Sequence, residues 1–221
     1  MLIIKNIYLI LIISTVTICS VTVSSCSGRP GNPAQEFLDL SYGSDPQNNL
    51  DLSLPGGRTM DTPVIILFHG GGWVSGDKSD FNYLRRYFCR RGFAVFSVNY
   101  RLASVEGKGV EFILKDVSEA IAFIREKSSG WIYSKDRIFL TGHSAGGHIA
   151  LMYAFTLDTS RSIRGVVSFC GVTDLSDPLL REFLRRRQPD VDPENRNFDL
   201  LDFITGGSVK AKMMYSPLYT T

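Results

Sequence analysis

One stretch, residues 140–148, constrains what this chain can fold into more than any other part of it. A short apolar run at 136–140 leads into it and predicts a buried strand, and residues 149–154 after it predict a helix. Between strand and helix stands the pattern Gly-x-Ser-x-Gly, with its serine at position 144. This order is typical of a nucleophile elbow, a sharp turn that raises a serine hydroxyl above the carboxyl edge of a sheet.

The residue types of the turn suit that geometry. Gly142 and Gly146 are expected where the strand and helix backbones nearly touch, because a side chain would not fit there. Ser144 is expected at a helix N-terminus, where free N–H groups and the helix dipole favour developing negative charge. A glycine-rich turn with an incidental serine is the alternative, but the strand before it and the helix after it favour the elbow.

A second glycine motif follows another apolar run. Residues 64–68 predict a strand buried on both faces, and His-Gly-Gly-Gly-Trp follows at 69–73. Glycines in this position let the backbone approach a substrate and point N–H groups at the oxyanion of a tetrahedral intermediate. A flexible loop is the alternative, and the pairing with the downstream elbow favours the oxyanion loop.

The order of the remaining segments predicts an α/β fold. Residues 35–42 and 48–54 alternate apolar and polar and predict an antiparallel pair, whereas 93–98 and 165–169 predict further buried strands. Helices are expected at 79–91 and 110–127, the second with Phe112, Val117, Ala120, Ile121 and Ile124 on its apolar face. Strands that alternate with helices specify a mostly parallel sheet with helices on both faces.

Residues 174–221 look different from the rest of the chain. They contain a charged helix near 178–187, a polar stretch from 188 to 197 and a short amphipathic segment at 198–204. They are expected to form a cap or excursion over the sheet, and no strand is expected after residue 170.

Three motifs together resemble the α/β-hydrolase superfamily: His-Gly-Gly-Gly-Trp at 69–73, Asn-Tyr-Arg-Leu at 99–102 and Gly-His-Ser-Ala-Gly-Gly at 142–147. Within it the chain is similar to the hormone-sensitive-lipase-like carboxylesterases, near the acetyl and feruloyl esterase branch, from about residue 36 onwards. The resemblance implies that Ser144 is the nucleophile. It implies an oxyanion hole formed by the N–H groups of Gly71, Gly72 and Ala145. By the same resemblance, Asp116 and Asp174 fall at positions that such proteins often fill with Asp, and we interpret both as structural.

The chain departs from the family pattern in its histidines. A serine nucleophile needs a base, usually a histidine oriented by a carboxylate, in the chain order Ser, acid, His. No histidine follows His148, which lies one helical turn beyond Ser144 and is expected to be structural because the elbow aims the hydroxyl away from its own helix. Asp190 and Asp202 therefore have no histidine to orient.

The same resemblance says what is missing. Residues 216–219 resemble the segment that leads into the next core strand, with the acid and the histidine still to come. The chain is accordingly expected to be truncated at its C-terminus, to lack the last strands and to be inactive by itself. Its strand at 165–169 is expected to have an open edge, which the segment 198–219 is the candidate to cover.

The N-terminus predicts an export signal. A weakly basic start precedes an apolar run at 7–18 that is short for a membrane span. Val-Ser-Ser-Cys at 23–26 resembles a bacterial lipobox, which implies a signal peptide at 1–25, lipidation of Cys26 and anchoring at the cell envelope. Residues 26–34 would form a flexible tether and 35–221 the hydrolase domain. The alternative is an ordinary secretory signal, and Cys19 is disfavoured as the lipid site because bulky Ile18 precedes it.

The amino-acid composition indicates which kinds of partner to expect. Lys and Arg number 24 against 22 Asp and Glu, so the chain is nearly neutral and nucleic acid is not expected as a partner. The arginine run at 185–187 is expected to be a solvated helix face. No Cys/His spacing suits zinc, and no metal or cofactor is expected. Cys89 and Cys170 remain after processing, either as a disulfide or as buried free thiols.

These observations favour a serine hydrolase of the carboxylic-ester type that forms an acyl-enzyme. Its expected substrates are small esters or acylated carbohydrates. Two alternatives remain: a non-catalytic surface lipoprotein that uses a hydrolase-like cleft for binding, and a peptidase or amidase of the same fold.

Overall fold

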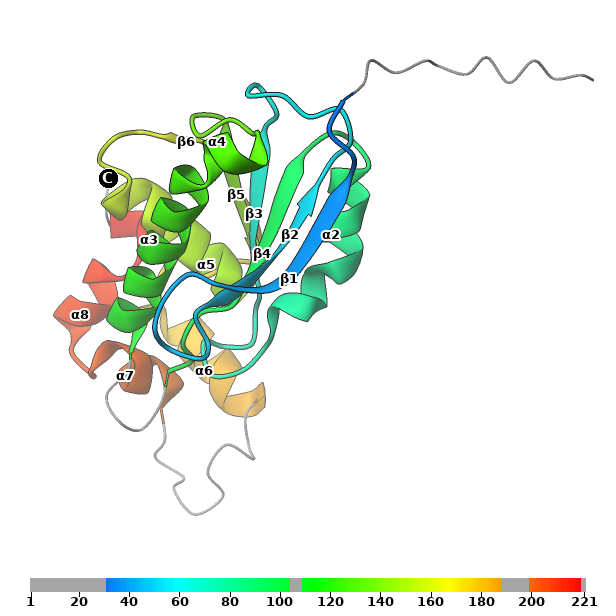
Figure 1. The fold of residues 1–221 in the computed structure, drawn as a ribbon. Helices are drawn as coiled ribbons and strands as arrows, with labels where there is room; N and C mark the ends of the chain where they lie inside the picture. Colours follow the sequence, from blue (N-terminus) through cyan, green and yellow to red (C-terminus); the bar gives the residue numbers. More distant parts are fainter. Residues whose placement is uncertain (1–30, 104–108, 188–198, 220–221) are drawn as a thin grey trace, which may run out of the picture. The chain divides into compact units, whose positions relative to one another are not determined.

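A six-stranded sheet is the framework of the protein, in the spatial order β1-β2-β4-β3-β5-β6 (Figure 1). The computed structural model describes residues 31–103, 109–187 and 199–219, so the segment 1–25, Cys26 and Asp190 lie outside the described residues. Strand β2 pairs antiparallel with both β1 and β4, and the pairs β4–β3, β3–β5 and β5–β6 are parallel. The strands are β1 (Gln35–Ser41), β2 (Asn49–Leu54), β3 (Val64–Phe68), β4 (Ala94–Val98), β5 (Ile138–His143) and β6 (Ile163–Phe169).

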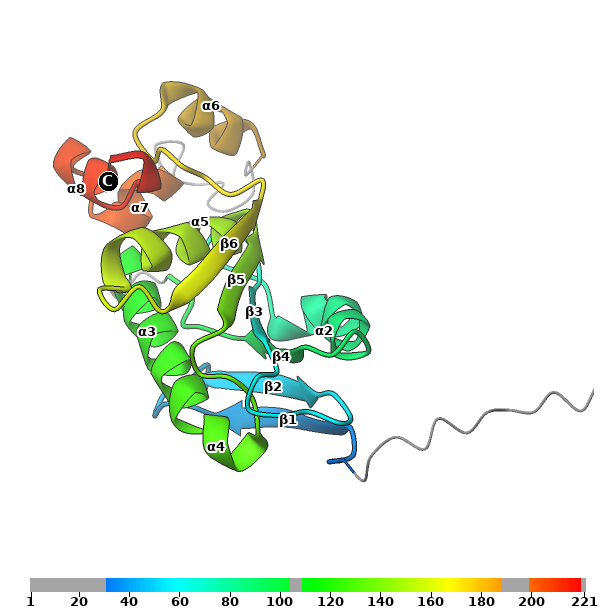
Figure 2. The ribbon, with the colours of Figure 1, turned by 90° about the horizontal axis from the view of Figure 1, so that it is seen from above.

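Helices cover the two faces of this sheet unequally. Helix α2 packs on one face, and α3 and α5 pack on the other (Figure 2). The helices are α2 (Asn82–Cys89), α3 (Val110–Glu126), α4 (Ser128–Trp131), α5 (Ala145–Met152), α6 (Pro178–Arg187), α7 (Leu200–Thr205) and α8 (Val209–Met214). Short 3-10 helices at Lys78–Phe81 and Pro217–Tyr219 and a π-helix at Tyr153–Leu157 complete the described elements. The mostly parallel α/β architecture predicted from the sequence is confirmed.

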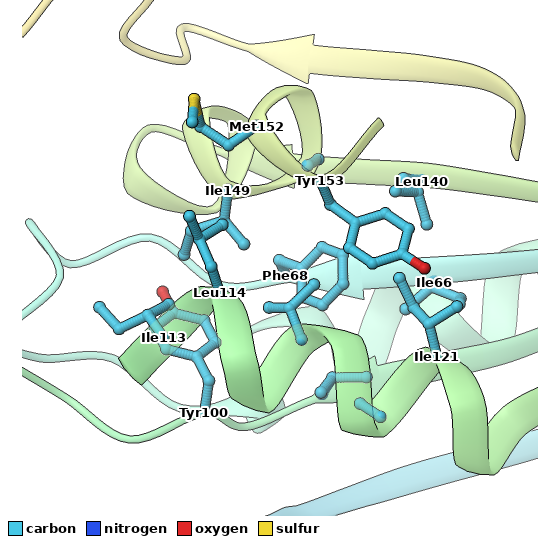
Figure 3. Packing of buried hydrophobic residues seen from close by; sticks show 14 of the residues in the cluster. Ile66, Phe68, Tyr100, Ile113, Leu114, Ile121, Leu140, Ile149, Met152 and Tyr153 are labelled. Carbon is cyan, nitrogen blue, oxygen red and sulfur yellow. The ribbon is translucent and has the colours of Figure 1, made fainter. Parts of the chain in front are cut away.

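The main core lies between the sheet and the helices α3 and α5. Alternate residues of β3 point to opposite faces, so Ile66 and Phe68 join this core while Ile65 and Leu67 face α2. In Figure 3, side chains of α3 and α5 gather around Phe68. Both faces of β3 are buried, which explains its unbroken apolar sequence.

One residue predicted for the apolar face of α3 is not buried. Phe112 is 38% exposed and lies beneath the Arg101 guanidinium, whose central carbon is 5.3 Å from the ring centroid. The buried face instead includes Ile113, together with the predicted Val117 and Ala120. The prediction was wrong at Phe112 because a helix turns about 100° per residue, and position 113 is the one in line with 117 and 120.

Ion pairs hold the C-terminal helices together. Arg181 of α6 contacts Asp199 at 3.0 Å and Asp202 of α7 at 3.2 Å, and Lys212 of α8 pairs with the same Asp202. Asp199 also caps α7 by accepting from the N–H of Asp202. Asp202 therefore has a structural role in the part of the chain that the structure describes.

On the α2 side, the described residues cover β5 and β6 only in part. There Phe139, Val167 and Phe169 are 36%, 55% and 52% exposed, and they line an apolar groove of about 340 Å³ against α2. Among the described strands none pairs with the outer edge of β6, as the sequence predicted. The candidate cover does not lie there: Leu200, Leu201 and Ile204 of α7 join the core on the α3 and α5 side.

Candidate active site

The turn between β5 and α5 has the geometry of a nucleophile elbow. Ser144 adopts φ 53° and ψ −117°, a conformation that residues other than glycine rarely take and that is typical of strained functional positions. It is the N-cap of α5. Its N–H donates to the carbonyl of Phe169 at 2.8 Å, which ties the turn to the end of β6, and its own carbonyl accepts from the N–H of His148.

The two flanking glycines permit this turn. A Cβ atom on Gly142 would lie 2.4 Å from the carbonyl carbon of Gly146, and one on Gly146 would lie 2.0 Å from the carbonyl oxygen of Phe68. Neither position can hold a side chain without moving backbone. The close approach of β5 and α5 predicted from the sequence is confirmed at Gly142 and Gly146, and the N-terminus of α5 also lies directly against the end of β3, which was not predicted.

The glycine loop after β3 lies beside the elbow. A Cβ on Gly70 would lie 3.5 Å from the Cβ of Ser144 and 2.9 Å from a ring nitrogen of His143. Gly71 and Gly72 have φ 108° and 61°, so the loop depends on the left-handed conformations that glycine adopts freely. The structure brings this loop together with Ser144 and with Ala145, the buried first residue of α5.

Tyr100, which follows β4, supports the start of the loop, and the next residue, Arg101, is held by α3. The Tyr100 hydroxyl donates to the carbonyl of His69 at 2.7 Å, and the two rings stack with centroids 4.3 Å apart. Arg101 donates from its backbone N–H and its guanidinium to the carboxylate of Asp116, which is fully buried. The interpretation of Asp116 as structural is confirmed. Asp174 accepts from the N–H and hydroxyl of Ser176.

None of the three histidine rings is hydrogen-bonded to the Ser144 hydroxyl in the described part of the chain. His69 is 1% exposed and directs Nδ1 at the carbonyl of Gly70, and burial lowers its pKa. His143 is exposed, and its Nδ1 would lie 2.9 Å from a Cβ atom on Gly70. His148 is fully buried and contacts Trp73 and Tyr215 through its two ring nitrogens. As expected, His148 is bonded within the core and not to the Ser144 hydroxyl.

The contacts of His148 were not predicted from the sequence. Trp73 Nε1 donates to Nδ1 at 3.2 Å, and Nε2 lies 2.7 Å from the carbonyl oxygen of Tyr215. The partners are 75 and 67 residues away along the chain, so no local pattern could have identified them.

In the part of the chain that the structure describes, Cys89 and Cys170 are free thiols. Cys89 is half-buried at the end of α2, where burial raises the pKa of its thiol, and Cys170 is exposed after β6. Of the two possibilities left open by the sequence, free thiols are observed, but Cys170 is not buried. Within the described ranges, no group of three or more His, Cys, Asp or Glu side chains could hold a metal ion.

Lowering the pH should destabilise the protein through His148. Burial lowers the pKa of His148 from 6.5 to about 4, so protons bind more tightly to the unfolded chain. The stability due to the neutral ring is complete above pH 6.5 and is lost as the pH falls towards 4, by about 3 kcal/mol in all.

Urea unfolding between about pH 7 and about pH 5 measures this loss. His69 contributes in the same direction. The His148→Asn variant should therefore keep only part of the slope. An unchanged slope in that variant would contradict the assignment.

Comparison with known proteins agrees with this geometry. The family model BD-FAE matches residues 50–196. A kynurenine formamidase from Danio rerio is 29% identical over 167 residues, which cover 73% of this chain and 54% of the fish protein. A probable isoprenylcysteine alpha-carbonyl methylesterase from Oryza sativa subsp. japonica is 36% identical over 117 residues, 53% of this chain and 27% of the plant protein. The chain thus spans about half the length of the fish protein and about a quarter of the plant protein.

Solved structures share the fold. Esterase B from Lactobacillus rhamnosis superimposes with a TM-score of 0.65 at 23% identity, covering 86% of this chain and 63% of the esterase. A bifunctional GH43-CE protein from Bacteroides eggerthii gives a TM-score of 0.65 at 23% identity, covering 84% of this chain and 29% of that protein. With its Gly-x-Ser-x-Gly elbow, its glycine loop and its six-stranded sheet, the chain belongs to the BD-FAE family of carboxylesterase-like α/β hydrolases.

Proposed function

We propose that this chain carries the nucleophile and the oxyanion hole of a serine carboxylesterase. The observation that carries the proposal is the strained Ser144 at the N-terminus of α5, with Gly70 of the glycine loop packed beside it. The Ser144 hydroxyl attacks the ester carbonyl, and the N–H groups of Gly71, Gly72 and Ala145 donate to the oxyanion. A general base takes the hydroxyl proton and returns it to the leaving alcohol as the intermediate collapses to an acyl-serine, which water then hydrolyses to the free acid.

The proposed substrates are small esters or acylated carbohydrates. Two names among the similar proteins support ester chemistry, the plant methylesterase and the bacterial esterase B. The fish relative is named a formamidase, which makes an amidase of the same fold the second candidate. A formanilide assayed beside a short-chain acetate ester separates the two, because only an amidase cleaves the anilide.

No described histidine is placed as the catalytic base for Ser144. His69 and His148 direct ring nitrogens at the backbone carbonyls of Gly70 and Tyr215, and exposed His143 shows no hydrogen bond to Ser144 among the described residues. A serine hydroxyl without a base is a weak nucleophile. We infer that these 221 residues are nearly inactive by themselves, because none of their histidines is placed as the base for Ser144. A general base contributes about 10²- to 10⁴-fold to such a rate, so the loss should be of that order.

Chemical rescue tests the proposal. The chain and its Ser144→Ala variant are mixed with a nitrophenyl acetate, with and without added imidazole. Imidazole also cleaves this ester by itself, so the variant supplies the background. We expect imidazole to accelerate hydrolysis by the parent chain above that background, because it replaces the missing base. Equal rates for the two proteins would contradict Ser144 as nucleophile and favour a non-catalytic binding role.

We also propose that the chain is exported and lipid-anchored through Cys26. The support is the sequence Val-Ser-Ser-Cys at 23–26 behind the apolar run. In the described ranges, no helix is long and apolar enough to cross a membrane. Mass spectrometry of the membrane fraction should find an N-terminal peptide that begins with diacylglyceryl-modified Cys26. A mature N-terminus at another residue would contradict the anchor.

A further inference from the structure

His148 links two parts of the candidate site through its buried ring. It lies on α5 one turn beyond Ser144, and its ring meets the indole of Trp73 edge to face, with centroids 5.3 Å apart and an interplanar angle of 87°. Trp73 immediately follows Gly72 in the glycine loop. One buried side chain therefore joins the elbow helix directly to the loop that faces Ser144.

The hydrogen bonds define the state of the ring. The Trp73 indole nitrogen can only donate, so His148 Nδ1 must be the unprotonated acceptor. The ring proton then lies on Nε2 and is donated to the carbonyl of Tyr215 at 2.7 Å. Both nitrogens are satisfied only in this neutral tautomer, and a doubly protonated ring would turn one N–H against the indole N–H.

The loop needs such a restraint at Trp73. This residue has φ 65°, a left-handed conformation that costs little for Gly71 and Gly72 but is unfavourable for a side chain as large as indole. The side chain is 1% exposed, and the Trp73 carbonyl accepts from the N–H of Ala103 at 2.8 Å. The strained backbone is thus held from both sides, by its carbonyl and by the indole on His148.

We propose that His148 is a positioning residue that fixes the glycine loop relative to Ser144 through Trp73. It acts on the oxyanion donors and does not touch the substrate. This role rests on the proposed function, in which the Gly71 and Gly72 N–H groups bind the oxyanion. A purely structural histidine would stabilise the fold without setting the conformation of residues 71–73.

The first test observes the His148 and Trp73 side chains directly, with no substitution at either residue. Long-range ¹H–¹⁵N spectra of the chain should show His148 with its proton on Nε2 and the Trp73 indole proton shifted downfield by its acceptor. The samples carry Val167→Lys on the opposite face of the sheet, a change that we expect to keep the chain monomeric and that lies on the groove facing α2. A His148 proton on Nδ1 would overturn the proposal without any need for a variant at the site.

Variants of Trp73 and His148 then distinguish positioning of the glycine loop from simple packing in the core. Trp73→Phe and His148→Leu each remove the hydrogen bond, whereas His148→Asn keeps an acceptor close to the place of Nδ1. We expect the first two to shift the Gly71 and Gly72 amide resonances in the same direction. They should also speed exchange of the Ala103 amide about ten-fold or more, because its acceptor is the Trp73 carbonyl. His148→Asn should restore most of both signals.

The other tryptophan provides the matched control. Trp131 packs on Phe37, Phe96 and Phe123, away from the loop, and Trp131→Phe should leave the loop signals unchanged. If Trp73→Phe and Trp131→Phe have equal effects at Gly71 and Gly72, the positioning role is wrong. These signals do not depend on turnover, so a failed imidazole rescue with intact loop shifts would count against the proposed function alone.

Discussion

The Gly146→Ala variant should fail to fold stably, although it adds a single methyl group. That methyl would lie 2.0 Å from the carbonyl oxygen of Phe68 and 2.5 Å from that of His69, so the backbone of β3 or α5 must move apart. Both elements belong to the main core and cannot shift without opening it. We expect a loss of about 3 kcal/mol or more in the free energy of unfolding, measured by urea denaturation.

Gly130→Ala is the matched control for this change. Gly130 lies in α4 with nothing within 4 Å of an added Cβ, so alanine there should be neutral or slightly stabilising, by about 0.5–1 kcal/mol. If Gly146→Ala were as stable as Gly130→Ala, the close crossing of strand and helix at the elbow would be wrong.

A lysine at position 167 should convert a self-associating chain into a monomer. Val167 is 55% exposed on the apolar groove, and it belongs to β6, whose outer edge has no partner among the described strands. An apolar strand with an open edge pairs with other chains, and a charged side chain on it prevents that pairing. Sedimentation over a dilution series should show a several-fold increase in monomer for Val167→Lys.

The opposite edge of the sheet supplies the control. Leu38 of β1 is equally exposed, at 54%, but β1 carries Glu36 and Asp39 and its register is interrupted between Phe37 and Leu40. Such features already protect an edge strand, so Leu38→Lys should change association little. A parent chain that is monomeric at every concentration would show that the β6 edge does not recruit other chains.

The local chemistry of this chain could be predicted from its sequence, and the long-range contacts could not. The apolar runs of β3 and β4 and the glycines at 142 and 146 specify their environments residue by residue, so the sheet and the elbow follow from them. The antiparallel start at β1 and β2 is equally local, since alternation and a turn define it.

Local sequence patterns could not predict which charged side chains are buried. Lys78 is 7% exposed because Asp51 and Asp39, from two neighbouring strands, both reach its ammonium group. Arg85 is fully buried, and its guanidinium donates to Glu36 of β1 and to Ser53 of β2. From the sequence alone, each of these lysine and arginine side chains would be expected on the surface. Each is buried because acidic partners from distant segments pair with it.

Labelling of the chain with a fluorophosphonate, followed by peptide mapping, tests the central claim most directly. The claim has two parts: Ser144 is the nucleophile, and none of the three histidines serves it as base. The account predicts slow labelling, confined to Ser144, abolished in Ser144→Ala and accelerated by imidazole. Rapid labelling of Ser144 without imidazole, or labelling of a different residue, would contradict it.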